Sequence, residues 1–219
     1  MSSMLDTGSS ILESADKPRP GVGSLLTAVV RSVAERVRLK VACAIARRSV
    51  AVVRREPAAL VHSLHTAKQV LVVCHGNIIR SAFAARLLRQ CLSGADHPRI
   101  VSAGVDALPG RSAHPIALRL ARRRQVDLHD HTATRVSAAA MQASDVVLAV
   151  DVIQLVVLRE RFPEARPKIH LLTSLAPSTP MDIADPINGD DRAFEVCFDH
   201  ITQAVDAICL AVITRTASR

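Results

Sequence analysis

The segment at residues 70–90, which reads V-L-V-V-C-H-G-N-I-I-R-S-A-F-A-A-R-L-L-R-Q, constrains the fold of this chain more than any other. A short apolar run typical of a buried strand leads into Cys74, and a helical pattern begins six residues later, at Arg80. The residues between them can turn their backbone N–H groups around an anion, and the helix adds the positive end of its dipole. The segment therefore predicts a strand, an anion-binding loop and a helix in succession.

Cys74 and Arg80 supply the side chains that such a loop needs for phosphoryl chemistry. Donors around Cys74 favour the nucleophilic thiolate, and the planar guanidinium of Arg80 matches two phosphoryl oxygens at once. The hydroxyl of Ser81 can donate to the sulfur. Besides these two catalytic residues, the residues that we expect to contact the bound phosphoryl group are His75, Gly76, Asn77, Ile78, Ile79 and Ser81.

A proton donor for the leaving group is predicted near the C-terminus. Asp185 precedes Pro186 and follows Cys74 by 111 positions. The proline biases Asp185 toward an extended backbone and stiffens the loop that carries the carboxyl group. Asp185 is therefore the candidate general acid, and Asp182 and Asp190 are the alternatives if Asp185 is structural.

These residues resemble the low-molecular-weight protein tyrosine phosphatases, particularly the bacterial branch found with exopolysaccharide production. The family's C-x-G-N-x-x-R-S loop is matched at residues 74–81. Further blocks follow in the family's order: V-S-A-G at 101–104, P-G at 109–110, V-D-L-H-D-H at 126–131, S-D-V-V-L-A at 144–149 and D-P at 185–186. The resemblance covers about residues 67–215.

The resemblance implies a mechanism without metal or cofactor. Cys74 would form a phosphocysteine, Arg80 would stabilise the phosphoryl oxygens, and Asp185 would protonate the leaving group. Ser102 and His131 match residues that brace the loop through hydrogen bonds. The substrate would be a phosphorylated protein, such as a tyrosine kinase that carries phosphotyrosine.

Two positions depart from the family's pattern. Ile79 stands where many members have a second cysteine, so the loop cannot form a disulfide of its own. Ile187 stands where an aromatic residue usually flanks the substrate ring, and the chain has no Trp and no Tyr. The pocket wall is therefore expected to be aliphatic, which weakens the inference that phosphotyrosine is the preferred substrate.

An alternation of strands and helices predicts an α/β fold. Apolar strand candidates at 69–73, 99–103, 145–150 and 168–172 alternate with helical stretches at 80–92, 113–124, 151–161 and 191–213. This pattern predicts a four-stranded parallel sheet flanked by helices, and by the resemblance the flavodoxin-like phosphatase fold. Ligands of such sheets bind at the carboxyl ends of the strands, where the Cys74 loop would lie.

The chain is expected to divide into three parts: a mobile N-terminus at 1–20, a basic helical extension at 21–66 and the phosphatase domain at 67–219. Segment 21–56 carries eight Lys or Arg against two Glu. The longest uncharged run in this part of the chain, at 20–30, has eleven residues, which is too short to span a membrane. The segment either packs on the domain as a solvated arm or attaches the protein peripherally to an anionic membrane or a partner.

The amino-acid composition bears on the cellular compartment and on the kinds of partner that the protein can bind. Five cysteines without a spaced framework favour a reducing compartment, and Cys43, Cys91, Cys197 and Cys209 are interpreted as packing thiols. A cytoplasmic protein is expected, with peripheral attachment at the inner membrane face as the alternative. Nucleic acid is a poor partner for a chain with 2% aromatic residues. The H-D-H run at 129–131 lacks further ligands at metal-binding spacing.

Three other functions use related features. Arsenate reductases of the same fold need a redox cysteine pair midway along the domain, yet no Cys occurs between Cys91 and Cys197. Phosphotransferase carrier subunits need neither Arg80 nor Asp185. A non-catalytic phosphoprotein-binding module would not require the nucleophile and the acid together, and turnover of an aryl phosphate would decide this alternative.

Overall fold

The computed structural model describes residues 22–94 and 97–216. Its contacts divide the chain into two units, Met1–Arg38 and Leu39–Arg219, and helix α1 (Val22–Arg55) belongs partly to each. The elements described below belong to the second unit. The expected mobility of residues 1–20 lies outside the described residues.

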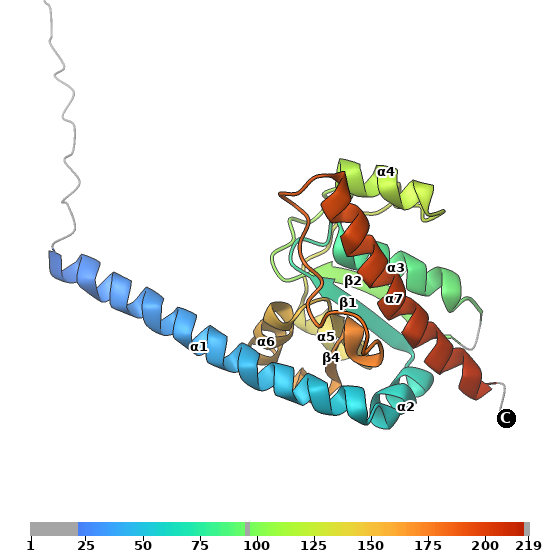
Figure 1. Ribbon diagram of the computed structural model, residues 1–219, viewed down its shortest axis with the longest axis horizontal. Helices are drawn as coiled ribbons and strands as arrows, with labels where there is room; N and C mark the ends of the chain where they lie inside the picture. The colour runs from blue at the N-terminus through green and yellow to red at the C-terminus, as the bar shows by residue number, and fades with distance from the viewer. Residues whose placement is uncertain (1–21, 95–96, 217–219) are drawn as a thin grey trace, which may run out of the picture. The chain divides into compact units, whose positions relative to one another are not determined.

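Four parallel strands form one sheet in the order β2-β1-β3-β4, which confirms the predicted architecture (Figure 1). They are β1 (Gln69–Cys74), β2 (Arg99–Gly104), β3 (Val146–Ala149) and β4 (Ile169–Leu171). Cys74 pairs with Gly104 in register, so the last residues of the two strands lie side by side at the carboxyl edge of the sheet.

The long predicted helices form at the expected positions as α3 (Arg80–Cys91), α4 (Pro115–Arg123), α6 (Val152–Arg161) and α7 (Asp191–Thr216). Helix α2 (Ala58–Thr66) lies within the helical extension expected at 21–66, whereas the short helix α5 (Ala138–Ala143) was not predicted. Two 3-10 helices, η1 (Pro163–Lys168) and η2 (Leu172–Leu175), flank β4. Short helices escape a periodicity argument because one or two turns do not establish a period.

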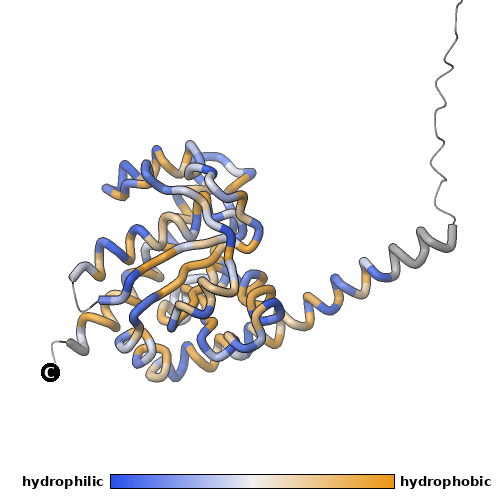
Figure 2. Tube along the Cα trace, turned by 180° about the vertical axis from the view of Figure 1, so that it is seen from behind, coloured by the Kyte–Doolittle hydropathy of each residue, from blue (hydrophilic) through white to orange (hydrophobic). Residues whose placement is uncertain are grey.

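The strands are buried on both faces, and the hydrophobic colouring of Figure 2 follows them through the centre of the unit. Val70 and Val72 of β1 share one core with buried residues of α2, α3, α4 and α7. Leu71 and Val73 point to the opposite face and share a second core with residues of α5 and α6. Because strand side chains alternate between faces, a strand covered on both sides reads as a continuous apolar run.

Residues 39–66 pack into this unit. Ala46 and Val50 of α1 are buried in the core that contains Leu71, and Leu60 and Leu64 of α2 are buried in the core on the other face. The contacts place the start of the compact unit at Leu39, whereas the sequence placed the start of the domain at residue 67. The difference arises because the apolar side chains of the segment supply core surface.

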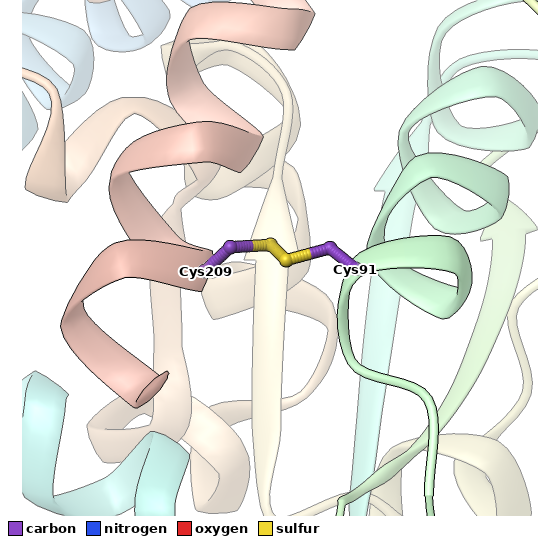
Figure 3. The surroundings of a disulfide bond; sticks show 2 residues. All are labelled: Cys91 and Cys209. Carbon is purple, nitrogen blue, oxygen red and sulfur yellow. A yellow bond between two sulfur atoms is a disulfide. The ribbon is translucent and has the colours of Figure 1, made fainter. Parts of the chain in front are cut away.

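A disulfide joins Cys91 at the end of α3 to Cys209 of α7, with 6.3 Å between the Cα atoms (Figure 3). The interpretation of these two cysteines as packing thiols was therefore wrong. Cys43, Cys74 and Cys197 are free. The pairing depends on the packing of two helices 118 residues apart in the chain, which no local pattern reveals. The disulfide also removes the cysteine-based argument for a reducing compartment.

Within the described part of the chain, one helix is long and apolar enough to cross a membrane, the stretch Asp191–Thr214 of α7. Phe194, Phe198 and Ile201 on this helix are fully buried in the core, and the ring of Phe198 stacks on Phe83 of α3 at 3.8 Å between centroids. Packing against α3 therefore accounts for the apolar composition of α7.

Candidate active site

The loop between β1 and α3 is shaped by two special positions. Asn77 has a φ of 54°, a left-handed conformation that asparagine tolerates better than most residues. Gly104 at the end of β2 lies against the loop, and a Cβ there would come within 2.4 Å of the His75 carbonyl oxygen and 2.8 Å of the Asn77 nitrogen. Only glycine lets the loop pass this close to the neighbouring strand.

Cys74 lies at the base of the loop and is 2% exposed. The backbone N–H of Asn77 donates to its sulfur at 3.2 Å, and the Ser81 hydroxyl oxygen lies 3.0 Å from the same atom. These contacts hold the sulfur at the base of the loop, facing the space that the loop encloses. The geometry thus places the sulfur where the sequence predicted a nucleophile.

Asn77 holds the loop together from behind the sulfur. Its Nδ2 donates to the hydroxyl oxygens of Ser81 at 2.8 Å and Ser102 at 3.0 Å, and its Oδ1 accepts from the Thr134 N–H at 2.8 Å. The Nε2 atom of His131 lies 2.6 Å from the Asn77 carbonyl oxygen. The structure therefore brings Ser102 and His131, two residues expected to brace the loop, into contact with Asn77.

Burial is the main cause that lowers the pKa of His131, against the raising effect of its bond to Asn77. The imidazole is therefore neutral at pH 7, and its bond to a carbonyl oxygen requires the proton on Nε2.

Arg80 is fixed by three groups from two later segments of the chain. Its Nη1 donates to Oδ2 of Asp151 at 2.8 Å and to the Ile183 carbonyl oxygen at 3.1 Å, while its Nη2 pairs with the carboxylate of Asp185. The Arg80 side chain is 3% exposed. These contacts fix the plane of the guanidinium and direct Nη2 toward Asp185.

Asp151 is a functional residue that the sequence reasoning missed. Its Oδ1 accepts from the Gln154 N–H at 2.9 Å and caps α6, while Oδ2 binds Arg80. Burial raises the pKa of Asp151, whereas the Gln154 hydrogen bond and the charge of Arg80 lower it. A signal was present, because Asp151 comes two residues after β3, at the carboxyl edge of a parallel sheet.

The three candidates for the general acid, Asp182, Asp185 and Asp190, differ in the groups that they contact. Asp182 accepts from the Val152 N–H at 2.8 Å, and Asp190 accepts from the Ala193 N–H at 3.0 Å near the start of α7. Asp185 differs because it lines the same cleft as Cys74. Among the three candidates for the acid, the geometry therefore favours Asp185.

The cleft opens above Cys74, and its wall combines Ile and Leu side chains with charged ones. Ile187 lines it, as expected from its position after Asp185-Pro186, together with residues of the loop after β2 that the sequence did not single out. Asn77 and Ser81, expected to contact the substrate, have their side chains in the buried network behind the sulfur. The lining residues are Cys74, His75, Gly76, Ile78, Ile79, Arg80, Asp106, Leu108, Arg111, Asp185 and Ile187.

Comparison with known proteins shows which family the sequence matches. Residues 69–218 match the family described as low molecular weight phosphotyrosine protein phosphatase. The probable low molecular weight protein-tyrosine-phosphatase EpsP of Ralstonia nicotianae is 34% identical over 140 residues, which are 64% of this chain and 92% of EpsP. Wzb of Salmonella typhi is 33% identical over 132 residues, which are 59% of this chain and 84% of Wzb.

Solved structures agree with these sequence matches. The tyrosine phosphatase AmsI of Erwinia amylovora superposes with a TM-score of 0.61 at 29% identity, covering 68% of this chain and 93% of AmsI. The YwlE arginine phosphatase of Geobacillus stearothermophilus has a TM-score of 0.63 at 28% identity, covering 69% of this chain and 97% of YwlE. This chain belongs to the low molecular weight phosphotyrosine protein phosphatase family.

Proposed function

We propose that this protein hydrolyses phosphotyrosine in phosphoproteins through a phosphocysteine intermediate. The observation that carries the proposal is the meeting of the Cys74 sulfur, the Arg80 guanidinium and the Asp185 carboxylate in one cleft. A nucleophile, an electrostatic clamp and an acid are the three groups that phosphomonoester cleavage requires.

In the first step, the Cys74 thiolate attacks phosphorus, and the bond to the leaving oxygen breaks. Arg80 exchanges its ion pair with Asp185 for the phosphoryl oxygens, while Asp151 keeps the guanidinium in place through Nη1. Release from Arg80 lets the Asp185 carboxylate take up a proton from solvent, and the resulting carboxylic acid protonates the departing oxygen. In the second step, Asp185 takes a proton from the attacking water, and the phosphorus–sulfur bond breaks.

The experiment is turnover of an aryl phosphate and of a phosphotyrosine peptide by the full-length protein. Cys74→Ser is expected to abolish turnover and to keep binding of a phosphate analogue, because the loop survives without a usable nucleophile. Arg80→Lys is expected to be nearly inactive, because a single ammonium group cannot hold two oxygens bidentately. Ordinary turnover by either variant would refute the assignment, whereas absence of turnover by the unchanged protein would leave the phosphoprotein-binding module as the alternative.

A phosphoarginine side chain is the second candidate substrate. Asp106 and Arg111 contribute charges of opposite sign to the cleft, and Ile187 replaces an aromatic neighbour of the substrate ring. A carboxylate favours a cationic guanidinium, and an aliphatic wall gives no ring-specific contact. Comparing kcat/KM for matched phosphotyrosine and phosphoarginine peptides distinguishes the two, and phosphotyrosine is expected to be preferred.

The partner and the location of the protein are further proposals. The candidate partner is a phosphotyrosine-bearing protein such as a tyrosine kinase, and the setting is the cytoplasm. Arg31, Arg36 and Lys40 on α1 are exposed, which favours contact of segment 21–56 with an anionic membrane or an acidic partner. Binding of the full-length protein to phosphatidylserine vesicles, weakening as salt rises, would support peripheral attachment at the inner membrane face.

A further inference from the structure

The part of α1 that belongs to the catalytic unit lies outside the region shared with the family. The family match begins at residue 69, and EpsP is covered over 92% of its own length by 140 residues of this chain. Residues 39–55 nevertheless contact the loop that carries the candidate acid, through two arginines. Those contacts give the segment a role in the reaction as well as in the core.

Arg47 contacts the later part of that loop, near Asp185. Its Nη2 lies 2.5 Å from Oδ2 of Asp182, while Oδ1 of Asp182 accepts from the Val152 N–H at 2.8 Å. Val152 directly follows Asp151, the residue that binds Arg80. Asp182 therefore ties α1 to the start of α6 and to the loop that leads to Asp185.

Arg54 contacts the preceding part of the loop. Its Nη2 donates to the carbonyl oxygens of Thr173 at 3.1 Å and Thr179 at 3.0 Å, and its Nη1 donates to that of Pro177 at 3.4 Å. One guanidinium thus satisfies three backbone acceptors, one within η2 and two in the residues that follow it. Without these donors, the carbonyl groups of Thr173 and Thr179, whose residues are buried, would lose their charged partner.

The same loop continues directly to the catalytic groups. Ile183 donates its N–H to the Val150 carbonyl at 3.3 Å and accepts from Arg80 with its own carbonyl oxygen at 3.1 Å. Asp185 follows two residues later and pairs with Arg80. An unbroken series of contacts therefore leads from Arg47 and Arg54 to the guanidinium that binds the phosphoryl group.

We propose that Arg47 and Arg54 of α1 are positioning residues that hold the loop at 173–185 so that Asp185 can deliver its proton. The proposal rests on the proposed function, because it assigns the two arginines to the acid of that reaction. It predicts that their loss weakens protonation of the leaving group more than attack by Cys74. The nucleophile sits on β1 and the loop before α3, and the hydrogen bonds and ion pair of these arginines go to other parts of the chain.

The contacts of the two arginines determine how large a loss of activity we expect on their removal. Arg47 and Asp182 are half and one-third exposed, and an exposed ion pair contributes about a factor of two to five to an equilibrium. Arg54 makes three hydrogen bonds to carbonyl groups, so its removal should displace the loop further, with about a tenfold loss for substrates that need the acid.

The test is a series of aryl phosphates whose leaving groups range from activated to poor, assayed with the full-length protein. Arg47→Ala and Arg54→Met are expected to lower kcat/KM by about two- to fivefold and about tenfold for the poorest leaving group, and by less than about twofold for the most activated one. Arg47→Lys should restore most of the loss, because an ammonium group still pairs with Asp182. Arg48→Ala is the matched control, since Arg48 is an exposed neighbour on the same helix.

Two outcomes would overturn the proposal. Arg47→Ala and Arg54→Met could both match Arg48→Ala across the series, or their losses could be equal for all leaving groups, which would indicate a purely structural effect. Asp185→Asn, measured in parallel, separates this failure from failure of the proposed function. If Asp185→Asn itself shows no dependence on the leaving group, the assignment of the acid is wrong; if it does, only the role of the arginines is refuted.

Discussion

Asn77→Ala is the sharpest test of how the phosphate loop is held. The side chain of Asn77 is fully buried and makes three hydrogen bonds, to Ser81, Ser102 and the Thr134 N–H. Each such bond contributes about 1 kcal/mol net. Alanine at a φ of 54° adds a cost of roughly 1 to 2 kcal/mol. We therefore expect the free energy of unfolding to fall by about 4 kcal/mol, a large part of the 5 to 15 kcal/mol typical of a domain.

Asn77→Gly separates the two contributions. Glycine removes the same hydrogen bonds but adopts the positive φ without a steric cost. The glycine variant should therefore be more stable than the alanine variant by about 1 to 2 kcal/mol, the strain term alone. Both variants should also lose turnover, roughly ten- to a hundredfold, because a displaced loop misplaces Cys74 relative to phosphorus.

Urea denaturation followed by far-UV circular dichroism measures these changes, because the chain contains no Trp and no Tyr for fluorescence. The slope of the free energy against urea must stay constant between variants for the comparison to hold. If Asn77→Ala lowers the free energy of unfolding by less than about 1 kcal/mol, the three hydrogen bonds of Asn77 do not stabilise the fold as argued. Equal losses in the alanine and glycine variants would refute the argument from backbone conformation.

Gly104→Ala should greatly reduce turnover and lower the melting temperature, because its Cβ would meet backbone atoms of the phosphate loop at 2.4 and 2.8 Å; wild-type activity and stability in this variant would contradict the close approach. Burial lowers the pKa of His170 from 6.5 to about 4, so below pH 6.5 the unfolded chain binds a proton that the folded chain does not. Stability should therefore fall between pH 6.5 and 4, and His170→Gln should remove about 2 kcal/mol of that fall at pH 4.5 in urea titrations, whereas equal pH profiles would exclude the histidine as its source. Cys91→Ser should lower the free energy of unfolding by roughly 2 to 5 kcal/mol, because the disulfide closes a separation of 118 residues, and the same loss should appear when the wild-type protein is unfolded in dithiothreitol.

The predictions made from local sequence agree with the structure because strand, loop and helix are coded within a short stretch. The strand predicted at 69–73 extends to Cys74, and the helix predicted from Arg80 to residue 92 ends at Cys91. The apolar run, the Gly-Asn pair and the helical spacing each specify their own element, so no distant partner was needed.

Contacts between distant residues could not be predicted in this way. Asp151 binds Arg80 across 71 residues, and an Asp before a helix reads equally well as an ordinary N-cap, which Asp151 also is. The pairing of Cys91 with Cys209 likewise depends on how α3 packs against α7. An Asp or a Cys in the sequence does not show which residue it will contact, because the partner depends on how the helices pack in the folded protein.

The basic extension shows the same limit in its charges. Arginines on a helix are ordinarily solvated, so the eight Lys or Arg of segment 21–56 indicated a general attraction to anionic surfaces. Arg47 and Arg54 instead direct their charge at a carboxylate and three carbonyl groups of the catalytic unit. Membrane binding, if it occurs, must therefore rely on the other basic residues. Substituting Arg47 or Arg54 should change the chemistry of Asp185 while leaving the salt dependence of vesicle binding nearly unchanged.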